Sequence, residues 1–334
     1  MDRTGSRLSR RQVVQGAGVL GAGLLVGCGR LPWQTRPSAR IPHVGVLAGD
    51  GTRALTAVVA IEQALAEQGY VEGSSMVLGF RSADGDLQQL SRLAAELVSL
   101  PVDLIVATGP ASAHAAHDAT HTIPIVMQYT RDPIAEGLVA SLARPAGNIT
   151  GVTAYYSSLT SKRLELLRDS VPRLARVAVI NPSPTSAGGS PTVQAAAERL
   201  GLQFYYVELV ERDPAATFDA AVQAGAEGLI VVGRIGDGTS LARFADVAGH
   251  RLPIIYGDRV GPVAGGLMSY GPSITALYRQ LGSYTARVLQ GARPANLPLE
   301  EPREFEFVIN LQTARALGLT IPHHVLLQAT EVIE

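Results

Sequence analysis

The sequence predicts an α/β protein with two doubly wound parallel-sheet lobes joined by a multi-strand hinge. From Pro42 onward, short runs rich in Val and Ile alternate with longer stretches rich in Ala, Leu and Glu, as buried parallel strands alternate with helices. The alternation falls into two blocks, each long enough for its own sheet. The remaining residues, 265–334, are too few for a third block. We therefore expect them to complete the two sheets, with the chain crossing between lobes more than once.

The first block alternates four short apolar runs with four longer amphipathic ones. The helix predicted over 56–68 ends at Gly69, a residue typical of the position just after a helix. The expected strands are residues 43–47, 76–80, 104–107 and 125–127, and the expected helices are residues 56–68, 87–100, 112–119 and 136–142.

The second block repeats the pattern. Residues 145–156, PAGNITGVTAYY, connect the blocks and are rich in turn formers and β-branched residues. The expected helices are residues 161–170, 191–200, 214–224 and 240–249, and the expected strands are residues 177–180, 204–208, 229–232 and 254–256. In the tail we expect helices over 275–289 and 311–317 and a strand over 305–309.

The first 28 residues contain GAGVLG, residues 16–21, which matches the dinucleotide-binding pattern GxGxxG. That pattern requires a preceding strand and an acidic residue about 20 positions later, and the sequence offers neither. We therefore interpret the glycines as part of a leader peptide, and we expect no cofactor.

The leader has the features of a bacterial export signal. Four arginines precede residues 13–27, which are weakly apolar and too short to span a membrane. Ser9-Arg10-Arg11-Gln12-Val13-Val14 resembles a twin-arginine signal. Residues 25–28, LVGC, resemble a lipobox, and Cys28 is the only cysteine of the chain. We expect a signal peptide over 1–27, lipidation of Cys28 and a tether over 28–41; a plain signal peptide with an incidental cysteine remains open.

Composition and motifs exclude several classes of function. The net charge is −1 and only 17% of residues are charged, without a basic stripe for nucleic acid. GxSxG, HExxH and GxxxxGK[ST] are absent from the sequence, so we expect no enzyme. His114, His117 and His121 share a helix face, but the first and last lie about 10 Å apart along the axis. We interpret them as a polar face exposed to water and expect no metal.

Small polar residues follow the predicted strands, where open α/β sheets bind ligands. A Gly-Pro turn within residues 108–112 opens a helix, so free backbone N–H groups could hold an anion there, although ordinary helix capping explains it too. Asp132 and Asp258 could accept a ligand ammonium or cap turns, and Arg234 could pair with a carboxylate or lie exposed. The candidate ligand-binding residues are Gly49, Asp50, Thr108, Gly109, Pro110, Ala111, Ser112, Asp132, Tyr155, Asn181, Arg234 and Asp258. Tyr155, Tyr256 and Tyr270 could stack on a flat ligand, or pack internally as half-buried tyrosines usually do.

Several stretches resemble the bacterial ABC-transporter substrate-binding protein family of the tryptophan/tyrosine type, with the type 1 periplasmic-binding fold. They run in order over most of the chain: LAEQGYVEG (65–73), LAAELVSLPVDLIVATG (93–109), TIPIVM (122–127), DPIAEGLVASLARPAGNITG (132–151), KRLELL (162–167), GGLMSYGP (265–272) and FEFVINLQTARALGLTIP (305–322). The resemblance implies one lobe of residues 42–152 plus 261–302 and another of residues 153–260 plus 303–334.

The resemblance also implies a function without catalysis. Together with the leader, it predicts a monomeric, lipid-anchored receptor in the periplasm that closes its lobes on a small solute and delivers it to a membrane permease. We expect export by the twin-arginine route, with the general export route left open. The well-known ligands of the family are aromatic amino acids. Two alternatives remain open, a ligand-sensing subunit for a membrane signalling partner and an enzyme on the same two-lobed frame.

Overall fold

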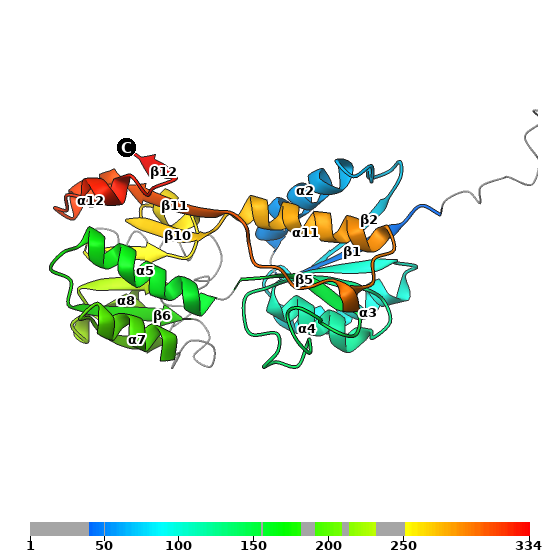
Figure 1. Ribbon diagram of the computed structural model, residues 1–334, viewed down its shortest axis with the longest axis horizontal. Coiled ribbons are helices and arrows are strands. Elements are labelled where there is room, and N and C mark those ends of the chain that lie inside the picture. The colour runs from blue at the N-terminus through cyan, green and yellow to red at the C-terminus, as the bar shows by residue number, and fades with distance from the viewer. Residues whose placement is uncertain (1–39, 50, 155, 182–190, 209–213, 232–250) are drawn as a thin grey trace, which may run out of the picture. The chain divides into compact units, whose positions relative to one another are not determined.

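The computed structural model describes residues 40–49, 51–154, 156–181, 191–208, 214–231 and 251–334. Their strands form two separate sheets, one of five strands and one of seven (Figure 1). A search of these residues finds no helix with the length and apolar character needed to cross a bilayer. The leader, Cys28 and the tether lie outside the described residues.

The first sheet is entirely parallel, with the strand order β2-β1-β3-β4-β5. Most of its strand residues are fully buried, which is why they read as continuous Val and Ile runs in the sequence. Its strands are β1 (His43–Ala48), β2 (Val77–Ser82), β3 (Leu104–Thr108), β4 (Ile125–Tyr129) and β5 (Ile149–Thr153).

Helices cover both faces of this sheet. On one face α2 (Gly51–Ala66) packs against α11 (Ile274–Leu289), and both bury side chains against β1 and β3 (Figure 1). The other face is covered by α3 (Leu90–Ser99) and α4 (Pro110–Ala119). Two short 3-10 turns, η1 (Leu87–Gln89) and η2 (Pro294–Asn296), complete the lobe.

The second sheet has the order β12-β11-β10-β9-β8-β6-β7, parallel except for the antiparallel pair β10–β11. Buried residues of α5 and α7 pack on one face, and those of α8 on the other. The strands are β6 (Arg176–Asn181), β7 (Gln203–Glu208), β8 (Gly228–Val231), β9 (Ile254–Tyr256), β10 (Met268–Pro272), β11 (Phe305–Asn310) and β12 (Glu331–Ile333). The helices are α5 (Tyr156–Ser170), α7 (Pro191–Arg199), α8 (Pro214–Gln223), α10 (Val260–Val263), α12 (Leu311–Ala316) and α13 (His323–Leu326).

Most expected elements are present, and the differences have local causes. Residues 136–142 form turns rather than the expected helix, because Gly137 has φ +76° and the side chain of Glu136 is bound by residues outside the loop. Residues 149–153, expected to lie in a connection, form β5. The helix expected over 240–249 lies outside the described residues.

The tail also differs from expectation in one respect. Residues 261–272 were expected in the first lobe, but β10 pairs with β9 and β11 in the second sheet. The pairing is directed by its apolar residues, since Met268 lies opposite Ile255 and Ile309 in the sheet register. The tail therefore adds three strands to the second sheet and the helix α11 to the first.

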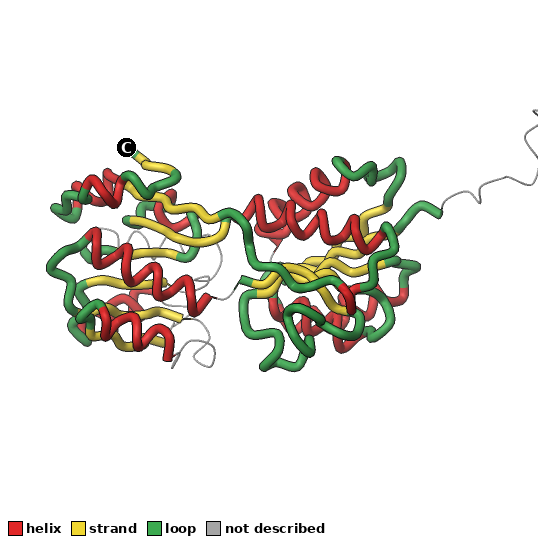
Figure 2. Tube along the Cα trace, viewed as in Figure 1, coloured by secondary structure: helices red, strands yellow, loops and turns green. Residues whose placement is uncertain are grey.

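The chain passes between the two lobes at three places, after β5, after β10 and before β11. Backbone hydrogen bonds hold these connections together. Ser273 N–H donates to the Glu304 carbonyl at 3.0 Å, and Thr153 N–H donates to the Glu300 carbonyl at 2.8 Å. Figure 2 shows the loop that leads to β11 running along the edge of β5, where Glu300 forms a bridge with Val152.

We predict that Gly151→Ala strongly destabilises the protein. Gly151 has φ +142°, and a Cβ atom there would lie 2.0 Å from the Met127 carbonyl oxygen of β4. Relieving that clash requires a backbone shift inside the sheet, so the free energy of unfolding should fall by about 3 kcal/mol. Urea denaturation measures the change. Gly79→Ala is the control, because its Cβ would meet no atom closer than 3.9 Å; an equal effect of both substitutions would contradict the explanation.

Candidate ligand-binding site

The carboxyl end of β3 leads directly into the amino end of α4. Gly109 makes the turn at φ +102°, a backbone conformation that favours glycine, and its N–H donates to the Gln128 carbonyl at 3.0 Å. Pro110 begins the helix, and Gly109 has no side chain to cap it. The first N–H groups of a helix have no intrahelical acceptor, so the amides of Ala111 and Ser112 are available to an anion at the positive end of the helix dipole.

Ser112 adds a hydroxyl to this helix terminus. The residue is only 1% exposed, yet its Oγ has no hydrogen-bond partner among the residues that the structure describes. A buried hydroxyl without a partner is unfavourable. The Oγ lies 3.9 Å from the point where a Cβ on Gly49 would be, so the carboxyl ends of β1 and β3 meet at this hydroxyl.

Two threonines extend the same edge. Thr108 is paired with Ala48 and Gln128 in the sheet, and its Oγ1 lies 3.4 Å from the Leu47 carbonyl oxygen. Thr153, the last residue of β5, is fully buried, and its Oγ1 makes no hydrogen bond within the described part of the chain. We call Gly49, Thr108–Ser112 and Thr153 the strand-end cluster. Ser112 supplies a buried hydroxyl beside the helix amino terminus, a pair that suits a small polar or anionic group. Thr153 supplies a second buried hydroxyl at the same edge, two strands away from β3 in the sheet order.

The loop after β4 is held against α4 by the carboxylate of Glu136. Its Oε2 accepts hydrogen bonds from the Tyr129 hydroxyl at 2.5 Å and from His114 Nε2 at 2.8 Å, and it forms an ion pair with Arg131 at 2.8 Å. One carboxylate oxygen therefore connects β4, α4 and the loop after β4.

These contacts shift the pKa values of Glu136 and Tyr129. Burial alone would raise the pKa of Glu136, but hydrogen bonds from Tyr129 and His114 and the charge of Arg131 lower it below the usual value. Burial, and then the bond to Glu136, raise the pKa of the Tyr129 hydroxyl. The carboxylate is thus ionised and the tyrosine neutral at neutral pH, which keeps the loop bound to α4.

The carboxylates of Asp132 and Asp258 each accept backbone hydrogen bonds within their own turn. Asp132 Oδ1 accepts the N–H groups of Ile134 and Ala135 at 2.9 and 3.0 Å, and Asp258 Oδ1 accepts the N–H of Val260 at 3.1 Å. These are the capping roles that the sequence left as the alternative. A role in binding a ligand ammonium stays a prediction for both.

In the second lobe, the side chain of Arg163 reaches the middle of β10 and the residue that follows β9. It is fully buried, which is rare for arginine. Its Nε donates to the Tyr270 carbonyl at 2.8 Å, and its Nη2 lies 3.5 Å from the Gly257 carbonyl oxygen. Arg163 thus holds the backbone of β10 to the segment that follows β9.

The remaining predicted residues divide into two groups. Asn181 is the last residue of β6, paired with Glu208, whereas Asp50, Tyr155 and Arg234 lie outside the described residues. Of the two other candidate tyrosines, Tyr256 is buried and Tyr270 is partly buried. Tyr256 is 2% exposed, and Tyr270 stacks on Phe305 with ring centroids 6.0 Å apart.

The three histidines do not converge; His114 and His117 lie in α4, and His121 follows it. His114 points to Tyr129 and Glu136, while the rings of His117 and His121 contact each other with centroids 5.0 Å apart. Burial, and then the neighbouring His121, lower the pKa of His117. Over the described ranges, no three His, Cys, Asp or Glu side chains are grouped so that they could hold a metal ion.

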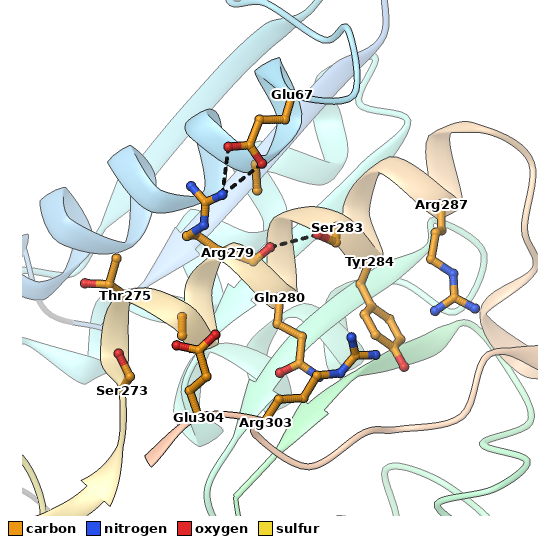
Figure 3. Close-up of a pocket in the computed structure, with 12 residues that line it drawn as sticks. Glu67, Ser273, Thr275, Arg279, Gln280, Ser283, Tyr284, Arg287, Arg303 and Glu304 are labelled. Carbon is orange, nitrogen blue, oxygen red and sulfur yellow. Dashed lines mark hydrogen bonds and ion pairs between the residues drawn. The ribbon is translucent and has the colours of Figure 1, made fainter. Parts of the chain in front are cut away.

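A separate polar groove of about 520 Å³ lies along α2 and α11 and includes Arg303 and Glu304 (Figure 3). Arg279 contacts both carboxylate oxygens of Glu67, at 2.7 and 2.9 Å. Arg303 and Arg287 approach Glu300 at 2.6 and 3.8 Å. Because each arginine of the groove already lies beside a glutamate, the strand-end cluster is the better candidate for a ligand.

Two parallel-sheet lobes, joined by several crossovers and with polar groups at the strand ends, define the type 1 periplasmic binding proteins. Solved structures agree with this class. A conserved domain protein from Vibrio cholerae matches with a TM-score of 0.79 at 22% identity, covering 88% of this chain and 100% of that one. The ABC domain of Streptococcus pneumoniae in complex with L-Trp matches with a TM-score of 0.76 at 26% identity, covering 87% and 99%.

Sequence comparison identifies the family. The model of the ABC transporter substrate binding protein family matches residues 44–333. A tyrosine-binding protein from Clostridioides difficile is 27% identical over 324 residues, which are 91% of this chain and 90% of the relative. The chain therefore belongs to the ABC transporter substrate binding protein family, whose members bind a small-molecule substrate and work with an ABC permease.

Several residues of the site were not found by sequence reasoning. Arg163 lies in the helix expected over 161–170 and was not among the candidate residues, and Glu136 lies in a segment expected to be helical. Thr153 lies in a segment expected to be a connection. One feature of the sequence pointed to the loop that contains Glu136: Arg131 lies next to Asp132, directly after a buried strand.

We predict that Glu136→Gln lowers the free energy of unfolding by about 1–2 kcal/mol at pH 7, because the ion pair and charge-assisted hydrogen bonds are lost. The folded-state pKa of Glu136 is below the usual value of a glutamate in an unfolded chain. The contribution of its carboxylate to the free energy of unfolding is therefore complete above the unfolded-state pKa. It disappears as the pH falls through the lowered folded-state pKa. Urea denaturation from pH 7 to pH 3 should show the two proteins converging in acid.

The control is Glu96→Gln, which removes exposed ion pairs with Arg81 and Arg92 and should change stability by less than about 0.5 kcal/mol. A difference between wild type and Glu136→Gln that does not change with pH would contradict the role assigned to the charge of Glu136.

Proposed function

We propose that this protein is the extracytoplasmic receptor of an ABC importer and that it captures a small organic carboxylate, an aromatic amino acid above all, by closure of its two lobes. The observation that carries the proposal is the buried Ser112 hydroxyl, without a partner in the described residues, at the amino end of α4. Hydroxyl and amide donors at a helix start are suited to a carboxylate.

Two further observations support the choice of ligand. The relatives include a tyrosine-binding protein and a domain in complex with L-Trp, both amino acids with a carboxylate and an aromatic ring. Closure follows from binding energetics, since a solute that contacts both lobes favours the closed state by its differential affinity. The three crossovers provide the hinge.

We predict that Ser112→Ala weakens binding of the cognate amino acid at least tenfold, because a hydrogen bond to a charged group is lost. The free energy of unfolding without ligand should stay the same or rise, because the substitution removes a buried hydroxyl that has no partner in the described residues. Isothermal titration with L-tryptophan, L-tyrosine and L-leucine measures the first effect, and urea denaturation the second.

Ser99→Ala is the control, because that exposed hydroxyl donates only to the Glu96 carbonyl of its own helix. Loss of stability together with unchanged affinity would show that Ser112 has a structural role. Failure of a broad panel of amino acids and aromatic acids to bind, with an unchanged radius of gyration in solution scattering, would contradict the receptor proposal itself.

We further propose that residues 1–27 direct export by the twin-arginine route and that Cys28 carries a lipid anchor in the periplasm. The arginine pair before a weakly apolar segment and the LVGC sequence support both steps.

We predict that Cys28→Ala moves the protein from the membrane fraction to the soluble periplasmic fraction, because the thiol that carries the lipid is removed. Fractionation and labelling with a fatty-acid analogue measure this. Ser38→Ala, in the same tether, is the control. Membrane association and labelling that persist in Cys28→Ala would exclude the lipobox.

A further inference from the structure

Leu87 is an exposed apolar side chain at the strand-end cluster. It is 54% exposed, and its Cδ2 lies 3.1 Å from the point where a Cβ on Gly49 would be. The Ser112 Oγ, which has no partner among the described residues, lies 3.9 Å from that same point. A methyl group of Leu87 and the hydroxyl of Ser112 therefore both lie within 4 Å of one point beside Gly49, so a group bound next to that point would be close to both.

The backbone holds Leu87 in this position. Ala83 N–H donates to the Ala48 carbonyl and Gly85 N–H to the Gly49 carbonyl, each at 2.9 Å, so the turn after β2 is bound to the end of β1. Asp86 Oδ1 then accepts the Gln88 N–H and caps η1, in which Leu87 is the first residue. An apolar side chain fixed by its backbone at the edge of a polar site is preorganised to contact a ligand.

A second exposed apolar residue lies in another loop of the same edge. Ile134 is 43% exposed and follows Asp132 in the loop after β4. In the strand order β2-β1-β3-β4, the loops with Leu87 and Ile134 therefore lie on either side of the amino end of α4. A single exposed leucine needs no explanation, but apolar residues on both sides of an anion-binding helix terminus suit a carboxylate that carries an apolar group.

We propose that Leu87 is a specificity-determining residue, which contacts the apolar side chain of an amino acid whose carboxylate is bound by Ser112 and the α4 amides. This inference rests on the proposed function and adds the residue that selects large apolar side chains over small ones. A sugar or a short polar acid would not bury the Leu87 side chain, so its affinity would not increase through this residue.

The test compares a large and a small amino acid. L-Tryptophan, L-tyrosine and L-alanine are titrated calorimetrically into wild type, Leu87→Ala and Leu87→Asn. We expect Leu87→Ala to weaken binding of the aromatic amino acids about tenfold, as the lost apolar contact predicts, with L-alanine changed less than about twofold. Leu87→Asn should reduce the preference for aromatic amino acids further. Thermal unfolding without ligand should not change, because the side chain is more than half exposed.

Two matched variants make the result specific. Leu100→Ala removes a leucine that is 40% exposed and follows α3, near the amino end of β3 and so at the opposite edge of the sheet; it should change no affinity. Gly49→Ala places a methyl group in the space between Leu87 and Ser112 and should weaken binding of the aromatic amino acids more than that of L-alanine.

Unchanged affinities in the Leu87 variants, or an equal loss for aromatic amino acids and L-alanine, would overturn the assignment of Leu87 while the receptor proposal stands. Wild-type protein that binds another solute but none of the three amino acids would overturn the ligand class. Protein that binds no solute at all would overturn the proposed function as well.

Discussion

The parallel alignment of β1, β3, β4 and β5 is the constraint on which the candidate site depends. Parallel strands point their carboxyl ends to the same edge, so chain segments far apart in sequence meet there. Thr108 is hydrogen-bonded between β1 and β4, and Gly109 then turns the chain into α4 with its amide bound to β4. The amino end of α4 is therefore positioned by the sheet and needs no capping side chain of its own.

Hydrogen bonds to fixed elements hold the loops that surround this edge. Glu136 binds the loop after β4 to α4, and Asp132 closes the first turn of the same loop. The turn after β2 is bound to the end of β1. These contacts preorganise the loops, so less ordering free energy is lost when a ligand binds. The hydroxyls of Ser112 and Thr153, in contrast, have no hydrogen-bond partner in the part of the chain that the structure describes.

In the second lobe, a buried side chain holds the backbone of β10 and of the segment that follows β9. A buried guanidinium from α5 fixes the carbonyl groups of Tyr270 and Gly257, next to the crossover that leads to α11. The connections between the lobes are joined to one another by Ser273 and Glu304, and one of them to β5 by Glu300. Each lobe has its own apolar clusters on the two faces of its sheet. Such an arrangement suits lobes that move as units, as in other substrate-binding proteins.

The sequence by itself determined the α/β class, most strands and helices, and the helix start within residues 108–112. The reason is that buried parallel strands and a Gly-Pro turn each produce a recognisable pattern within a few residues. Only the tertiary structure decided that Glu136 serves a hydrogen-bond cluster instead of a helix, that β10 joins the second sheet, and that Arg163 is buried. It also decided which polar atoms the fold leaves without partners in the described residues. Each of these outcomes depends on contacts between residues distant in sequence, and no periodicity within a short segment encodes such contacts.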